Sequence, residues 1–155
     1  MQILFNGNRL FEVCYWGLGS KYALGRPMSA TTTQMSLADS LQTRFIDFGA
    51  KITGLIQKLP RSPAGTHYAR QMLRSGTAAA PNYAEARSAE SRADFIHKMR
   101  IVLKELNETA VWLRMAVRSR LVSADLTTEI HTEAEELCRI VAASIRTAKS
   151  SRHPE

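Results

Sequence analysis

A helical spacing of apolar residues begins at Leu37, and it constrains the fold more than any other feature of the chain. In the first segment the apolar positions step by three or four residues over about six turns, which is the pattern of an amphipathic helix. Pro60 ends this segment, and Ser62 followed by Pro63 predicts the cap and first turn of the next helix. The first stripe consists of Leu37, Leu41, Phe45, Phe48, Ile52, Leu55 and Leu59.

Three further segments repeat this spacing. The second is expected from about Pro63 to Ala89, and Ser91 with Asp94 predicts a capping pair at the start of the third. The second stripe is Tyr68, Met72, Ser75, Ala79, Asn82 or Tyr83, and Ala86. The third is Phe95, Met99, Val102, Leu106, Thr109, Leu113 and Ala116, and the fourth is Leu126, Ile130, Glu133, Leu137, Ile140, Ser144 and Ala148. Four such helices with short loops predict an all-α, antiparallel up-down four-helix bundle.

The bundle is expected to occupy residues 36–149. Residues 1–35 show no sustained helical period and lack the basic start of a signal peptide, so we interpret them as a weakly ordered leader or upstream extension. Residues 150–155 are interpreted as a tail.

The composition permits one domain with a real core and favours anionic partners. The chain has 155 residues, is 45% hydrophobic and carries a net charge of +7. Cys14 and Cys138 lie far apart and match no metal-ligand spacing, so a reducing cytoplasm is expected. No apolar stretch reaches the roughly 18 residues that a membrane helix needs, so no membrane partner is expected.

The segment RSGTAAAPNYAEA, residues 74–86, places a proline inside a helical pattern. A proline deletes a backbone hydrogen bond and bends the helix, and small neighbours allow a second helix to approach closely. Arg74, Ala78, Pro81 and Glu85 share one face. Two interpretations stay open: a kinked second helix that wraps its own bundle, or a helix whose second face contacts another subunit.

The third helix adds a second apolar face of its own, which favours a partner. On this face Ile101, Trp112 and Met115 lie beside two glutamates, away from the core stripe. The predicted oligomer interface therefore consists of Ala78, Pro81, Glu85, Ile101, Glu105, Glu108, Trp112 and Met115.

The segment RSGTAAAPNYAEARSAESRADFIHKMRIVLKELNETAVWL resembles the four-helix-bundle family of proteins encoded in intervening sequences of 23S ribosomal RNA genes. The likeness extends from about residue 37 to residue 148. It implies a bundle that assembles as a ring-like homopentamer. It also implies relatives that serve diversity-generating retroelements as accessory factors, binding the reverse transcriptase and nucleic acid, and it implies no enzymatic activity. The matching residues are Gln71, Arg74, Ser75, Asn82, Ala84, Glu85, Ser91, Asp94, Phe95, Lys98, Lys104, Glu105, Glu108, Trp112 and Leu113.

The sequence shows no motif of a known catalytic or metal site. It contains no phosphate-binding glycine loop, no nucleophile elbow and no cysteine with a nearby histidine. A di-iron bundle needs Glu-x-x-His on two helices, and only Asp94 with His97 comes close. Glu105 with Glu108 could form a catalytic carboxylate pair, although an interface or solvent role is favoured. We therefore expect no enzyme, no cofactor and no metal.

Basic residues are segregated along the predicted helices. Residues 44–120 hold 14 Lys and Arg against 6 Asp and Glu, whereas residues 121–138 hold 5 acids and no Lys or Arg. Such segregation is typical of an electrostatic binding surface. An acid-free stripe on the third helix consists of Arg100, Lys104, Asn107, Val111, Arg114 and Arg118, and a shorter row on the second consists of His67, Arg70 and Arg74.

These rows predict a surface that binds the backbone of RNA or DNA without reading bases, since no aromatic residue lies on the stripe. The alternatives are a solvated face, or a scaffold that binds an acidic protein surface such as that of a polymerase. Glu133 falls on the fourth stripe and needs a cationic partner, which Arg74, Lys98 or a neighbour's arginine could supply. The predicted nucleic-acid-binding residues are Arg70, Arg74, Arg100, Lys104, Arg114 and Arg118.

Overall fold

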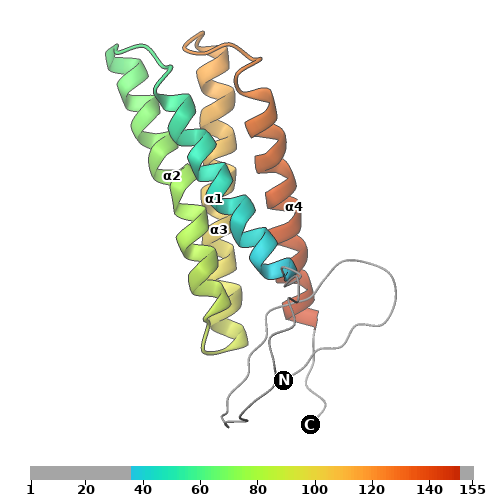
Figure 1. The fold of residues 1–155 in the computed structure, drawn as a ribbon. Helices are drawn as coiled ribbons and strands as arrows, with labels where there is room; N and C mark the ends of the chain where they lie inside the picture. Colours follow the sequence, from blue (N-terminus) through green and yellow to red (C-terminus); the bar gives the residue numbers. More distant parts are fainter. Residues whose placement is uncertain (1–35, 151–155) are drawn as a thin grey trace, which may run out of the picture.

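Four helices that reverse direction one after another form the protein (Figure 1). The computed structural model describes residues 36–150, so the interpretations of residues 1–35 and of 151–155 lie outside the described residues. The helices are α1 (Leu37–Ile56), α2 (Pro63–Arg87), α3 (Arg92–Arg118) and α4 (Thr128–Ser150). The described residues contain no strand, and the predicted all-α four-helix bundle is confirmed.

Serine caps begin the first three helices. The side-chain oxygens of Ser36, Ser62 and Ser91 each accept a hydrogen bond of 3.1 Å from the backbone N–H three residues further on. Each cap satisfies one of the donors that a helix start leaves unpaired. The caps predicted at Ser62 and Ser91 are therefore confirmed. After α3 the chain turns through Arg120, whose φ of 56° is left-handed.

The core lies between the four helices and follows the predicted stripes closely. Phe45, Met72, Met99 and Leu137 are all fully or almost fully buried. The stripes fail at two ends, because Leu37 and Leu126 remain 43% and 42% exposed. Leu37 opens the first turn of α1, and Leu126 lies in the loop before α4, and none of the four described helices covers either side chain.

The small residues of α2 serve neighbours within the same chain. A Cβ added to Gly76 would lie 2.8 Å from a methyl carbon of Ile52, so glycine permits the close crossing of α1 and α2. On the α3 side, Thr109 Oγ1 donates a hydrogen bond of 2.8 Å to Ser75 Oγ, and both side chains are fully buried. Residues 74–79 thus let α2 lie between α1 and α3. The helix continues through the exposed Pro81, and the expected bend there stays a prediction.

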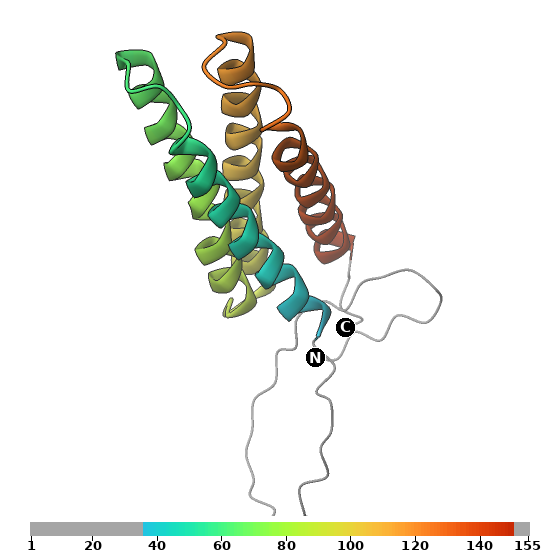
Figure 2. The ribbon, with the colours of Figure 1, turned by 45° about the horizontal axis from the view of Figure 1, so that its top comes forward.

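Ion pairs span the contact between α1 and α4, which is thinner than those between successive helices. In both ribbon views α1 starts near the end of α4 and diverges from it (Figure 2). Arg44 donates bidentate hydrogen bonds of 2.9 and 3.0 Å to Glu133, and Lys51 lies 2.6 Å from Glu129. The partner of Glu133 is therefore Arg44, which none of the sequence-based alternatives included. The side chain of Glu133 is 24% exposed rather than buried in the core.

Candidate nucleic-acid interface

The basic stripe of α3 forms an exposed row of cations. Arg100, Lys104, Arg114 and Arg118 are all exposed. Lys104 has a long contact of 3.9 Å to Glu105, whereas no carboxylate among the described residues pairs with Arg100, Arg114 or Arg118. Three guanidinium groups of this α3 row therefore have no counter-charge among the described residues.

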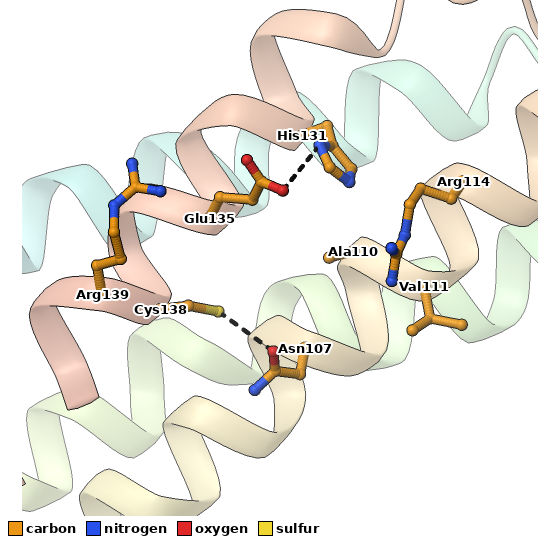
Figure 3. Close-up of a pocket in the computed structure, with 8 residues that line it drawn as sticks. All are labelled: Asn107, Ala110, Val111, Arg114, His131, Glu135, Cys138 and Arg139. Atoms are coloured by element: carbon orange, nitrogen blue, oxygen red, sulfur yellow. Dashed lines mark hydrogen bonds and ion pairs between the residues drawn. The ribbon is translucent and has the colours of Figure 1, made fainter.

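A groove between α3 and α4 adjoins this row and contains two cavities, of about 360 and 290 Å³. Figure 3 shows the larger one, with side chains from both helices around it. Arg114 and His131 line both cavities. The other residues of the larger cavity are Asn107, Ala110, Val111, Glu135, Cys138 and Arg139. The basic stripe therefore borders a groove, and Arg114 belongs to both.

The polar side chains that line the larger cavity form few hydrogen bonds with one another. His131 Nδ1 lies 3.8 Å from Glu135 Oε1, while its Nε2 is buried and has no hydrogen-bond partner among residues 36–150. Cys138 donates a weak hydrogen bond of 3.7 Å to Asn107 Oδ1 (Figure 3). Burial and the charge of Glu135 raise the pKa of the Cys138 thiol, against a smaller opposing effect of Arg139.

Sequence reasoning missed the α4 side of this groove. His131, Cys138 and Arg139 are seven and eight positions apart, which places them on neighbouring rows of one helix. The acid-rich segment 121–138 gives the first half of α4 a negative charge, which predicts no basic surface there. The features that could have indicated this side of the groove are the helical spacing and the basic Arg139, which directly follows the acid-rich segment.

Arg74 is an internal ion-pair partner rather than a free cation. Its guanidinium contacts Glu105 at 3.7 Å and forms a closer contact with Glu108, both on α3. Arg70 is exposed on α2. Arg74 and Lys104 contact the same carboxylate, that of Glu105, so the two predicted basic rows meet there. Arg114 lies on the α4 side of α3, away from Arg74.

The carboxylates of Glu105 and Glu108 hold Arg74, which argues against a catalytic pair. Burial alone would raise the pKa of Glu108. Hydrogen bonds from Trp112 and Arg74, with the charges of Arg74 and Lys104, outweigh that effect and leave the pKa below its usual value. A general acid needs a raised pKa to carry a proton near neutral pH, so Glu108 is tuned in the opposite direction.

The predicted oligomer face is partly used within the chain. Trp112 packs against the core and against two α2 rings, with centroid distances of 5.6 Å to His67 and 5.3 Å to Tyr68. Glu105 is only 6% exposed, and Glu85 pairs with Lys98 at 2.5 Å. The expectation that Trp112 and Glu105 lie well away from the bundle's own packing is therefore wrong: α2 covers them.

The rest of that face remains open to a partner. Met115 is 39% exposed, and Pro81 is exposed as well. Ala78 and Ile101 are half-buried. These four residues could still contact another subunit, and the predicted oligomer interface stays a prediction.

Neither a metal site nor a membrane span is found in the described part of the chain. Among residues 36–150, no three His, Cys, Asp or Glu side chains gather in a way that could hold a metal ion. Within the same range, no helix combines the length and apolar character that crossing a bilayer requires.

Comparisons with known proteins identify the family. The model of the 23S rRNA-intervening sequence protein family matches residues 41–143. A crystal structure of a protein of unknown function from the S23 ribosomal protein family of Bacteroides thetaiotaomicron is 32% identical, with a TM-score of 0.64 over 68% of this chain and 98% of that one. No curated protein matches. On the family match and this structural likeness, the chain belongs to the 23S rRNA-intervening sequence protein family.

Proposed function

We propose that this protein is a non-enzymatic, oligomeric accessory protein that binds the backbone of nucleic acid through α3. The observation that carries the proposal is the row formed by Arg100, Arg114 and Arg118, which no carboxylate among the described residues neutralises. Exposed arginines without counter-charges suit phosphate, because the planar guanidinium donates two parallel hydrogen bonds to its oxygens.

The length of the row supports contact with several phosphates. Arg100 and Arg118 are separated by 18 positions in one continuous helix, and a rise of about 1.5 Å per residue places them about 27 Å apart. One turn of duplex DNA is about 34 Å long. A single α3 therefore spans most of a helical turn, and this reach suits recognition of the backbone rather than of one base.

Assembly would multiply this surface. A homo-oligomer, with the pentamer as the leading expectation, repeats the α3 row in every subunit. Met115 on α3 and Pro81 on α2 are both exposed and suit a subunit contact. Linked copies convert later binding steps into intramolecular ones, so a modest charge per subunit gives a strong total affinity.

The alternative is a scaffold that binds an acidic protein surface such as that of a polymerase. The same unpaired arginines favour it, since a carboxylate also accepts bidentate hydrogen bonds from arginine. Charge alone does not separate a phosphate partner from a carboxylate partner, so the two proposals differ in what binds rather than in which residues bind.

A binding assay over a salt series separates the two. Fluorescently labelled duplex DNA and a structured RNA are titrated with the full chain at several salt concentrations. Backbone binding predicts that log affinity falls linearly with log salt, by about 0.9 for each phosphate neutralised on duplex DNA. Failure of both probes to bind at low salt would remove the nucleic-acid proposal and leave the scaffold as the better account.

A further inference from the structure

We infer that the groove between α3 and α4 binds single-stranded nucleic acid, with a base in the larger cavity and the flanking phosphates on Arg114 and Arg139. This inference rests on the proposed function and deepens it, because it names the form of nucleic acid and the place where it binds. It also adds α4 residues to a surface that the sequence had assigned to α2 and α3.

The size of the cavity favours a group as large as one nucleotide. Its volume of about 360 Å³ lies at the lower end of the range of roughly 300–1,000 Å³ that small-molecule sites occupy. A duplex keeps its bases paired and stacked, so it can offer this cavity nothing but backbone. An unpaired strand can turn a base out of the stack, and proteins that recognise single strands use that freedom.

The lining of the cavity suits a base. Ala110 and Val111 supply apolar surface, and Val111 is 43% exposed. The side chain of Asn107 and the unpartnered Nε2 of His131 supply hydrogen-bonding groups. In Figure 3 the imidazole of His131 extends from α4 toward the α3 side of the cavity, where Arg114 lies. The chain itself leaves this buried nitrogen without a partner, and a base edge would satisfy it once the imidazole turns toward the cavity.

The charges around the cavity suit the phosphates on either side of that base. Figure 3 places Arg139 and Arg114 at opposite ends of the cavity, and Arg118 lines the adjoining smaller one. Neither Arg114 nor Arg139 has an ion pair among the described residues. One carboxylate, that of Glu135, opposes these three guanidinium groups. It is an acceptor that an exocyclic amine of a base can use, as in the pairing of Glu with cytosine.

Protection of Cys138 from alkylation tests the inference directly, since this half-buried thiol lines the cavity. The full chain is treated with iodoacetamide at mildly alkaline pH, and the modification of the Cys138 peptide is followed by mass spectrometry. The probes are a single-stranded oligocytidine of about twelve nucleotides, a duplex of the same length and a polyglutamate peptide. Binding of each probe is measured in parallel by fluorescence anisotropy.

The expected result is selective protection by the single strand. At a probe concentration about ten times its dissociation constant, about a tenth of the protein stays free, so alkylation of Cys138 slows about tenfold. The duplex contacts Arg114 and Arg118 through its backbone and places no base in the cavity, so it slows the reaction much less. Equal protection by the duplex overturns the inference, as does a bound single strand that gives no protection. Equal protection by polyglutamate overturns it in favour of an acidic protein partner.

A matched pair of charge reversals gives a second readout. Arg139→Glu removes a cation at the cavity, whereas Arg146→Glu makes the same change on α4 outside the residues that line it. Arg139→Glu should weaken single-strand binding by roughly tenfold or more, as expected when hydrogen bonds to a charged group are removed, and should leave duplex binding much less affected. Equal effects of the two variants contradict the inference. If no nucleic acid binds the unmodified chain at all, the proposed function itself fails.

Discussion

The carboxylate of Glu105 lies 3.7 Å from the guanidinium of Arg74, across the contact between α2 and α3. Glu105 is 6% exposed, so a carboxylate deep in the α2–α3 contact relies on a cation that is itself half in water. The sequence had assigned Arg74 to a nucleic-acid surface and Glu105 to a subunit contact. Their pairing ties both residues to the stability of the single bundle.

Removing Arg74 should therefore destabilise the fold. Arg74→Met leaves the buried Glu105 with only the longer, 3.9 Å contact to Lys104, and a loss of about 1–2 kcal/mol in the free energy of unfolding is expected once the exposure of Arg74 is taken into account. Arg70→Met is the control, with an expected change within about 0.5 kcal/mol because Arg70 is exposed and unpaired among the described residues. Urea unfolding measures both, and equal losses would contradict the role of the ion pair.

Two glycine substitutions should change stability in opposite directions. A Cβ at Gly65 would lie 1.9 Å from the carbonyl oxygen of Pro60, so Gly65→Ala forces the turn before α2 to move. A loss of about 1–3 kcal/mol is expected, as for other overpacked sites. At Gly54 an added Cβ meets nothing within 4 Å, so Gly54→Ala should raise stability by about 1 kcal/mol through helix propensity. Thermal unfolding distinguishes the two, and a tolerated Gly65→Ala would show that this turn is not tightly packed.

Acid should weaken the bundle partly through Glu108. Its pKa in the folded protein lies below the ordinary value of 4.5, so its contribution to stability is complete above that value and is lost as pH falls through the lower, folded-state pKa. The pKa values of Asp39 and Glu129 shift in the same direction, that of Asp39 chiefly through Ser36 and that of Glu129 chiefly through Lys51.

Glu108→Gln removes one of these acid-sensitive groups. The variant should therefore lose less stability than the unmodified protein when the pH is lowered from about 7 to about 3.5. Urea titrations at both pH values provide the measurement. A variant with the same or greater acid sensitivity would show that Glu108 does not contribute in this way.

Assembly is best tested at Met115. Trp112→Glu would confuse assembly with folding, because Trp112 packs against Tyr68 in its own chain. Met115 is 39% exposed, so Met115→Glu should leave the bundle folded, whereas at a subunit contact it buries an unpaired charge and should dissociate the oligomer. Ile46→Glu is the control at a 55% exposed site on α1. Light scattering that finds a monomeric unmodified protein at micromolar concentration would rule out the predicted oligomer.

The apolar spacing predicted the helices and most of the core because both follow from one period. Phe45, Met99 and Leu137 are buried where their stripes placed them, and Ser62 and Ser91 cap where local sequence patterns indicated. These features depend on residues within a few positions of one another. Features of this local kind can be predicted from the sequence alone.

The neighbours of each helix face could not be obtained in the same way. A helical wheel shows that Trp112 and Glu105 lie beside the stripe, but not that α2 approaches closely enough to cover them. Nor does it give the rotation that brings Arg44 to Glu133, or that makes Arg114 and His131 line one groove. Those relationships depend on how the helices cross. At the crossing of α1 and α2 the glycine at position 76 leaves the space that Ile52 occupies.

The most direct test of nucleic-acid binding by α3 is the salt dependence of duplex binding for the Arg114→Glu, Arg118→Glu double variant. Both side chains are exposed and unpaired among the described residues, so the fold should survive, as circular dichroism would verify. Because the variant neutralises two fewer phosphates, its affinity should fall for all sequences alike. The slope of log affinity against log salt should also become shallower by about 1.8. Unchanged affinity and slope at physiological salt would contradict the account, and the acidic-protein scaffold would then become the leading explanation of the basic stripe.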